Sequence, residues 1–340
     1  MSHLSYLEAI VVGAFQGVTE LFPVSSLGHS VLVPAVVGGS WGRDLNVSAP
    51  ESSYLAFIVG LHVATALALL VFFWRDWVAI VRGLLTSVVH RRIEEPHERL
   101  AWLIVIATIP VGISGLALEH LFRTTLGRPV PSAVFLTVNG AVLWGAELLR
   151  RRPRSVARSS VARPGPVPSP VGRGSRASQV SGESRRSATA DAGVLTMGDV
   201  ASSANGAVAD VRLSALGVGR ATLIGSSQVL ALLPGISRSG VTMAAGLLRG
   251  LDHEDAARFS FLLATPVILA AGVLKLPDLF GPLGARIHGQ VLAGSVASFI
   301  SAYVAVRFLT RWFHTRTLTP FAIYCLLAGA ASLLWLTLGS

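Results

Sequence analysis

Two short polar stretches carry the side chains that could do chemistry in this sequence. The first runs from Gln16 to Ser30, inside an otherwise apolar N-terminal region. It places a carboxylate (Glu20), two hydroxyls (Ser25 and Ser26) and an imidazole (His29) within ten residues. Ionisable side chains at the centre of a bilayer cost about 2.5–3.5 kcal/mol each on insertion scales, so they mark functional sites by default. The first stretch is therefore a candidate active site.

The second polar stretch, residues 234–242, reads P-G-I-S-R-S-G-V-T. The planar guanidinium of Arg238 suits phosphate oxygens in a region of low dielectric constant. Ser237, Ser239 and the N–H groups of the glycine-rich turn can add hydrogen bonds, and the start of a helix adds a favourable dipole. Thr242 is either a further phosphate contact or a hydroxyl bonded to its own helix. This stretch predicts a phosphate-binding site.

The first stretch supplies chemical groups that the predicted phosphate-binding site of the second stretch lacks. Glu20 can bind a divalent cation or act as a base, and Gln16, four residues earlier on the same helix face, can add a neutral metal ligand. Ser26 is a candidate nucleophile or phosphate contact. His29 can activate Ser26 or protonate a leaving group. Ser25 is interpreted first as a turn residue and second as a phosphate contact.

Together these residue types predict phosphoryl transfer or hydrolysis. A structural alternative is that Arg238 and Glu20 form an ion pair without a chemical role, although such a pair does not require the serines and glycines around it. Glu8, His62 and Asn139 are interpreted as interior polar residues without a chemical role.

The composition indicates a chain that crosses a membrane several times. It is 52% hydrophobic and 14% charged, with a mean hydropathy of +0.62, whereas soluble domains are about 25% charged. The net charge of +10 does not indicate nucleic-acid binding, because the arginines are concentrated in a few loops and one linker. That distribution follows the positive-inside rule.

Hydropathy predicts an all-α polytopic membrane protein with six transmembrane helices and two re-entrant helical hairpins. The hairpins cover residues 4–39 and 214–250 and hold the two polar stretches. The six spans are predicted at 54–74, 100–118, 131–149, 257–274, 289–309 and 320–338. A polar loop at 40–53 and a basic loop at 75–99 separate the first elements.

The chain divides into two inverted repeats, residues 1–149 and 213–340, each with a hairpin and three spans. L-F-P-x-x-S in the first half matches L-L-P-x-x-S in the second, and an odd number of spans per half inverts the second copy. Residues 150–212, rich in Arg, Ser, Pro and Gly, form a disordered basic cytoplasmic linker that either has no chemical role or contacts anionic lipid. Both termini and the mouth of the first hairpin are then external.

The two stretches resemble motifs of the bacterial undecaprenyl-diphosphate phosphatases, the bacitracin-resistance family. Gln16 and Glu20, followed by P-V-S-S-L-G-H, are similar to the family's E/Q-x-x-x-E and P-V-S-S-x-G-H motifs, and P-G-I-S-R-S-G-V-T is similar to P-G-x-S-R-S-G-x-T. The resemblance extends over nearly the whole chain outside the 150–212 linker. In two places the sequence departs from the pattern: Gln16 replaces the commoner Glu, and Leu27 stands where Thr is usual.

The resemblance implies an enzyme of the bacterial plasma membrane that hydrolyses undecaprenyl diphosphate to undecaprenyl phosphate and inorganic phosphate. This reaction recycles the lipid carrier for peptidoglycan synthesis and confers bacitracin resistance. It also implies Mg²⁺ or Ca²⁺ as cofactor and an active site that opens to the outer side. Membrane lipids are a further expected partner, and a second copy of the chain is a candidate partner. By motif position, Glu20, Ser26, His29 and Arg238 are the catalytic residues.

Several alternatives stay open at this point. The nucleophile is Ser26, His29 or a water molecule. A lipid phosphatase with an S-R-x5-H-x3-D motif does not fit, because Ala244 stands where its His would be. A transporter of the monophosphate carrier would use the same repeats but release no phosphate, and a purely structural scaffold would leave the two polar stretches unexplained.

Overall fold

The computed structural model describes residues 4–39, 45, 53–121, 126–151, 208–280 and 287–338. Within these ranges the chain is built from α-helices joined by short turns, with one 3₁₀ segment and no β-strand. The predicted all-α class is confirmed. Most of the predicted loop at 40–53 and linker positions 152–207 lie outside the described residues.

The helices follow the predicted order. In the first half they are α1 (Tyr6–Leu21), α2 (Ser26–Val37), α4 (Ser53–Phe72), α5 (Trp74–His90), α6 (Pro96–Leu121) and α7 (Pro129–Arg151). After a short helix at Val208–Ser214, the second half holds α9 (Val218–Ser226), the 3₁₀ helix η2 (Ser227–Leu232), α10 (Arg238–Leu248), α11 (His253–Phe280), α12 (His288–Thr315) and α13 (Thr319–Leu338).

Five of the described helices, α6, α7, α11, α12 and α13, are long and apolar enough to cross a membrane. α4 and α5 meet the same test together but are bent by 86° at their junction, and Val208–Ser214 with α9 and η2 forms a second bent pair, at 98°. The predicted spans coincide with α4, α6, α7, α11, α12 and α13. The protein is a multi-pass membrane protein.

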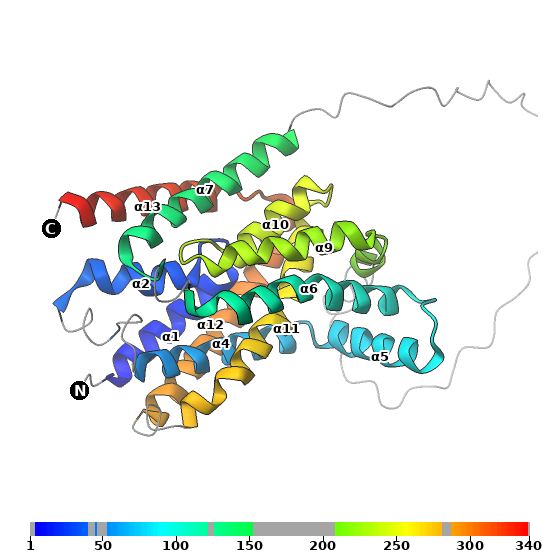
Figure 1. The fold of residues 1–340 in the computed structure, drawn as a ribbon, viewed down its shortest axis with the longest axis horizontal. Helices are drawn as coiled ribbons and strands as arrows, with labels where there is room; N and C mark the ends of the chain where they lie inside the picture. Colours follow the sequence, from blue (N-terminus) through cyan, green and yellow to red (C-terminus); the bar gives the residue numbers. More distant parts are fainter. Residues whose placement is uncertain are drawn as a thin grey trace, which may run out of the picture.

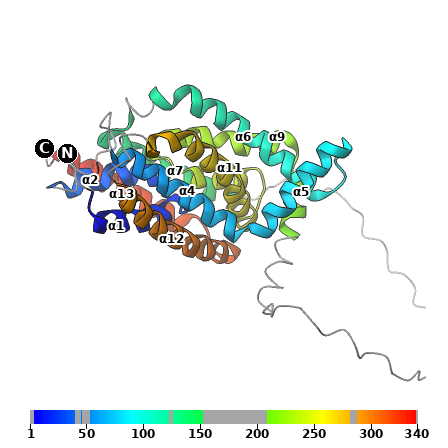
Figure 2. The ribbon, with the colours of Figure 1, turned by 90° about the horizontal axis from the view of Figure 1, so that it is seen from below.

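The region predicted as a basic loop at 75–99 is mostly the helix α5, so that prediction was wrong. The helix is amphipathic, with Ile80, Gly83 and Ser87 buried and Trp74 56% exposed. Figure 2 shows α5 turning away from α4 at one end of the molecule. An amphipathic helix at this angle can lie along a membrane surface, where apolar side chains and arginines are both accommodated. The arginines had obscured its helical periodicity.

The ends of the predicted linker are helical. α7 continues to Arg151, and the helix Val208–Ser214 begins before the predicted linker end at residue 212. This short helix is fixed to α11 by charge: Arg212 Nε donates to Asp255 Oδ2 at 2.8 Å, and Arg258 Nε donates to Asp210 Oδ1 at 3.0 Å. Composition alone did not predict these long-range ion pairs.

The two hairpins enter the helical bundle from opposite ends. In Figure 1 the hairpin α1–α2 opens toward the end that carries both termini, and the hairpin α9–α10 opens toward the end that carries α5. Their turns meet in the middle of the molecule, where Gly28 of α2 lies directly against Gly235. The expected meeting of the two polar stretches therefore occurs.

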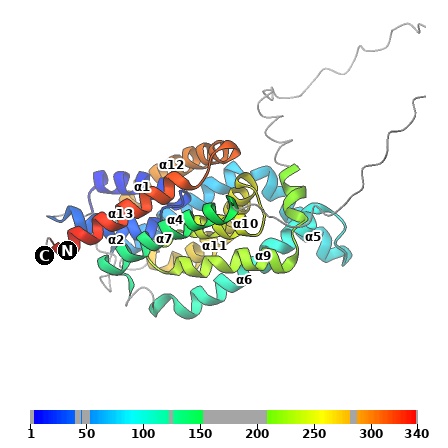
Figure 3. The same cartoon turned by 90° about the horizontal axis from the view of Figure 1, so that it is seen from above.

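Helices of the two halves pack in reciprocal pairs. α1 packs along α12, and α9 packs along α6. The last helices of the halves, α7 and α13, lie side by side (Figure 3), and α4 packs on α11. A twofold relation between repeats produces this contact pattern, so it supports the inverted repeats, whereas the repeat boundaries at 149 and 213 remain predictions.

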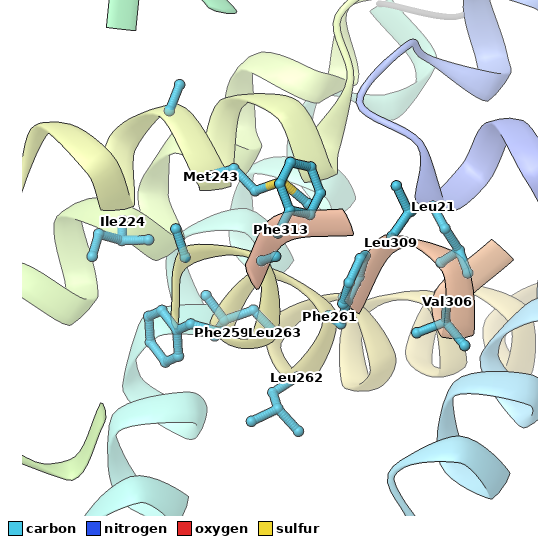
Figure 4. Packing of buried hydrophobic residues seen from close by; sticks show 14 of the residues in the cluster. Leu21, Ile224, Met243, Phe259, Phe261, Leu262, Leu263, Val306, Leu309 and Phe313 are labelled. Atoms are coloured by element: carbon cyan, nitrogen blue, oxygen red, sulfur yellow. The ribbon is translucent and has the colours of Figure 1, made fainter. Parts of the chain in front are cut away.

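Apolar side chains from both halves form one large core. Leu21 of α1 packs in the same cluster as Phe261 of α11, Leu309 and Phe313 of α12, and Met243 of α10 (Figure 4). Where α1 crosses α12, small residues allow close approach of the backbones, as is common between helices in membranes. A Cβ atom on Gly13 would meet the backbone of Gly294. The core thus fixes both hairpins against the same long helices.

Candidate active site

The first hairpin has its turn between Glu20 and Ser26. A capping box fixes the start of α1: the Ser5 hydroxyl accepts from the Glu8 N–H at 3.2 Å, and the Glu8 carboxylate accepts from the Ser5 N–H at 2.8 Å. Glu8 is therefore a capping residue, as its structural interpretation expected. α1 ends just before Pro23, which cannot continue a helix, and α2 begins at Ser26.

Ser25 shapes this turn. Its φ of 69° lies in the left-handed region, which is uncommon for a residue with a side chain. Its hydroxyl caps α2 by accepting from the Gly28 N–H at 3.2 Å. The geometry agrees with the interpretation of Ser25 as a turn residue, and its contact with phosphate stays a prediction.

The second turn depends on Gly235. This residue has a φ of 114°, and a Cβ atom there would lie 2.7 Å from the backbone nitrogen of Leu136. Only glycine meets both conditions at low cost. The turn leads directly into α10, whose first N–H groups are capped by Ser237, since the Ser237 hydroxyl accepts from the Gly240 N–H at 3.1 Å. Arg238 is thereby placed at the start of a helix, facing the first hairpin.

Glu20 stands where the hairpins meet, and it divides its two carboxylate oxygens between them. Oε1 pairs with Nη2 of Arg238. Oε2 accepts from the Ser26 hydroxyl at 2.5 Å and from the Gln16 amide at 3.0 Å. Both Glu20 and Gln16 are buried. The ion pair considered as a structural alternative exists, and the same carboxylate is placed to take the proton of Ser26.

His29 is held away from Ser26. Its Nδ1 lies 2.7 Å from the Ser25 carbonyl oxygen, and its Nε2 lies 2.7 Å from the Tyr324 hydroxyl. A carbonyl only accepts, so Nδ1 carries the proton, and Nε2 of the neutral ring accepts from Tyr324. The two rings stack with their centroids 5.7 Å apart. In the described structure no hydrogen bond joins His29 to Ser26, so the base nearest to Ser26 is Glu20 rather than the expected histidine.

The hydroxyls of the second stretch point to backbone atoms. Ser237 Oγ lies 3.1 Å from Ser239 Oγ, and Ser239 Oγ donates to the Phe22 carbonyl at 3.2 Å. Thr242 Oγ1 donates to the Arg238 carbonyl at 2.7 Å, one turn earlier in α10. For Thr242 the geometry therefore matches the helix-bonded alternative. The three hydroxyls surround the base of Arg238, and their contacts with phosphate remain predictions.

Asn139 of α7 links the two turns, a role that sequence reasoning missed. Its Nδ2 donates to the Pro23 carbonyl at 3.1 Å, and its Oδ1 accepts from the Ser237 N–H at 3.0 Å. The residue is 0% exposed. An asparagine within an apolar span was the available signal, because an amide at that depth needs internal partners.

The predicted metal ligands Gln16 and Glu20 lie side by side. Among the described residues, no three side chains of the types His, Cys, Asp and Glu form a metal-binding group. A cation here would use the Glu20 carboxylate with neutral donors. Carboxylate and amide oxygens are the donors that Mg²⁺ and Ca²⁺ prefer, so the pair fits such an ion. His62, missed as a site residue, lies against both of them.

The family model for the Bacitracin resistance protein BacA matches residues 9–331. The chain belongs to the BacA family. The match spans both hairpins and every helix that positions them.

Relatives of this BacA-family protein carry a consistent name. A protein of Mycolicibacterium paratuberculosis named undecaprenyl-diphosphatase is 64% identical over 337 residues, covering 99% of both chains. Undecaprenyl-diphosphatase 1 of Frankia casuarinae is 54% identical, covering 97% of this chain and 98% of its own. Undecaprenyl-diphosphatase 2 of Chromobacterium violaceum is 37% identical, covering 98% and 99%. The similarity therefore includes whole chains.

Proposed function

We propose that this BacA-family protein is a membrane phosphatase that hydrolyses undecaprenyl diphosphate to undecaprenyl phosphate and inorganic phosphate. The activity recycles the lipid carrier for peptidoglycan synthesis and confers resistance to bacitracin. One observation carries the proposal: Arg238 of the second hairpin and Ser26 of the first both bond to the buried carboxylate of Glu20. A phosphate-binding group, a nucleophile and a base thus converge at one point, and relatives that match over their whole length are named for this reaction.

Arg238 binds the terminal phosphate of the substrate. Its guanidinium is held at the start of α10, where free N–H groups and the helix dipole also favour an anion. Ser237, Ser239 and Thr242 are the proposed further phosphate contacts, and to bind phosphate their hydroxyls turn from the backbone partners that they have in the structure. Negative charge on the phosphoryl oxygens is thereby stabilised in the transition state.

Ser26 is the nucleophile that the geometry favours. Its oxygen forms a bond to the terminal phosphorus while the bond between that phosphorus and the bridging oxygen breaks, and Glu20 takes the Ser26 proton. Water then hydrolyses the phosphoserine, which releases inorganic phosphate and restores the hydroxyl. His29 is assigned to proton transfer at the leaving phosphate. Tyr324 orients its ring beforehand, and Nε2 exchanges the Tyr324 hydroxyl for the substrate when the substrate binds. A direct attack by water, activated by Glu20, is the second route.

The predicted cation, Mg²⁺ or Ca²⁺, would be held by Glu20 and Gln16. When bound, it supplies positive charge that offsets the negative charge of the diphosphate. Removing the cation would remove that positive charge, so a chelator is expected to lower the rate of phosphate release.

We place the active site on the outer side of the plasma membrane. α5, whose arginines follow the positive-inside rule, lies at the end of the molecule opposite both termini (Figure 1). The first hairpin opens toward the end with the termini, so its mouth faces outward in this orientation. Membrane lipids and a second copy of the chain are the remaining proposed partners.

The decisive experiment measures phosphate release from undecaprenyl diphosphate by the purified protein in detergent with Mg²⁺. Ser26→Ala and Arg238→Ala are each expected to lower the rate at least a hundredfold. The control Arg249→Ala removes an exposed arginine at the end of α10 and should leave the rate unchanged. Full activity of Ser26→Ala with loss in Arg238→Ala would support the water route. Full activity in both variants would contradict the site.

A second candidate function is transport of the monophosphate carrier, because opposed hairpins and reciprocal helix pairs are typical of transporters. The two functions separate in one assay. A folded wild-type protein that releases no phosphate but moves the carrier between leaflets of proteoliposomes would favour the transporter.

A further inference from the structure

His62 of α4 lies against the two predicted metal ligands of the first hairpin. Its Nε2 is 3.4 Å from Glu20 Oε2 and 3.3 Å from Gln16 Nε2, and the Gln16 amide is 3.0 Å from Glu20 Oε2. The three polar atoms form a nearly equilateral triangle. Two helices contribute to it, so the arrangement is a tertiary feature rather than a pattern within one helix.

The ring of His62 is oriented for a ligand. Nδ1 lies 2.8 Å from the Ile58 carbonyl oxygen, which only accepts, so Nδ1 carries a proton. In the neutral ring, Nε2 then directs a lone pair toward the Glu20 carboxylate. A backbone carbonyl that fixes Nδ1–H in this way is a common feature of histidines that bind metal through Nε2.

The size of the triangle matches the spacing of ligands around a small cation. With bonds of about 2.1 Å, neighbouring ligands are roughly 3.0 Å apart in an octahedral site and roughly 3.4 Å apart in a tetrahedral one. Turning the Gln16 amide by half a rotation exchanges its nitrogen and oxygen, which places three donors on the triangle.

Access also fits. Glu20 directs Oε1 to Arg238, and its Oε2, which accepts from Ser26, is the oxygen that faces the triangle. Gln16 is 2% exposed, whereas the side chain of His62 is 30% exposed. The His62 side of the triangle is therefore partly accessible, and catalytic metal sites keep such a position for water or substrate.

We propose that Gln16, Glu20 and His62 form one divalent-cation site with two oxygen donors and one nitrogen donor. The nitrogen donor makes the site bind a transition ion such as Mn²⁺ or Co²⁺ more tightly than Mg²⁺ or Ca²⁺, because imidazole is a better ligand for transition ions than for alkaline-earth ions. The proposal rests on the proposed function in one respect: the open position would face the diphosphate.

The test is pulsed electron paramagnetic resonance of Mn²⁺ bound to the purified full-length protein in detergent, without substrate. We expect modulation from a directly bound ¹⁴N nucleus, replaced by a ¹⁵N pattern when the protein is labelled with ¹⁵N-histidine. His62→Gln is expected to remove the modulation and to weaken Mn²⁺ binding at least tenfold. His288→Gln changes an exposed histidine at the start of α12 and is the matched control.

Absence of bound Mn²⁺ in the wild type, absence of nitrogen modulation, or unchanged binding in His62→Gln would each overturn the site and leave an ion pair between an imidazolium and Glu20. If His62→Gln does not fold, His29→Ala protein labelled with ¹⁵N-histidine is used instead. Modulation that survives this substitution excludes the other histidine of the site and supports His62, whereas loss of the modulation would contradict His62 as the ligand. Phosphate release without nitrogen modulation would contradict the proposed cation site but not the proposed phosphatase activity. Nitrogen modulation without phosphate release would contradict the phosphatase activity but not the cation site.

Discussion

Replacing Asn139 with leucine tests whether one buried amide holds the active site together. The substitution keeps the approximate volume but leaves the Pro23 carbonyl and the Ser237 N–H without the partners seen at 3.1 and 3.0 Å. Hydrogen bonds between helices in membrane proteins contribute about 0.6 kcal/mol on average and up to about 1.7 kcal/mol. The Ser237 N–H loses the Asn139 amide as its partner, and the Pro23 carbonyl keeps only a long bond from Cys325 Sγ at 3.7 Å, which moves the cost toward the upper end. We expect a loss of about 2–3 kcal/mol of unfolding free energy.

Activity should fall more than stability alone explains. The two turns position Ser26 and Arg238, and a displacement of about 1 Å at a reacting group can cost about a hundredfold in rate. The assays are unfolding by a denaturing detergent, followed by helical circular dichroism, and phosphate release from the folded fraction. Thr137→Val is the matched control, because the Thr137 hydroxyl bonds only within α7, to the Ala133 carbonyl. Stability within about 0.5 kcal/mol of the wild type, together with an unchanged rate, would refute the reasoning.

Three further predictions follow from the same geometry. Arg238→Lys keeps the charge but loses the planar fork, so kcat/KM for phosphate release should fall about 10–100-fold; an unchanged value would show that charge alone suffices. Tyr324→Phe removes the donor to His29, so kcat should fall several-fold while the thermal midpoint stays within about 3 °C; equal kcat would exclude the orienting role. Gly235→Ala combines a positive φ with a backbone clash and should lower unfolding free energy by more than about 2 kcal/mol, whereas Gly219→Ala, in open space, should not.

The six spans and both hairpins were predictable because length separates them. An apolar run of about 20 residues can cross a bilayer, whereas the shorter runs on either side of each polar stretch cannot. The sequence also predicted that Glu20 and Arg238 would meet, since inverted repeats bring such stretches together. It did not predict α5, because the arginines within the helix and those just after it together resemble a basic loop. The same limit explains the short helix at Val208–Ser214, whose ion pairs join residues far apart in the chain.

Within the site, residue types were predictable and pairings were not. Glu20 and Ser26 were identified, but their direct hydrogen bond depends on the turn at Ser25, whose positive φ is not visible in a pattern of residue types. His29 was expected to activate Ser26 or to protonate a leaving group. Its ring bonds to Tyr324, which lies 295 positions away in the chain, and not to Ser26. His62 was assigned no role because its neighbours come from another helix.

The ion pair between Glu20 and Arg238 has a consequence for how the protein is made. Its two residues are separated by 218 positions. At about 5–20 residues per second, the ribosome needs roughly 10–40 s to reach Arg238 after Glu20 has been synthesised. During that interval the first hairpin has its carboxylate but not its arginine, so the ion pair at the centre of the site forms only after the second hairpin has been made. Assembly of the active site is therefore a late event in the synthesis of the chain.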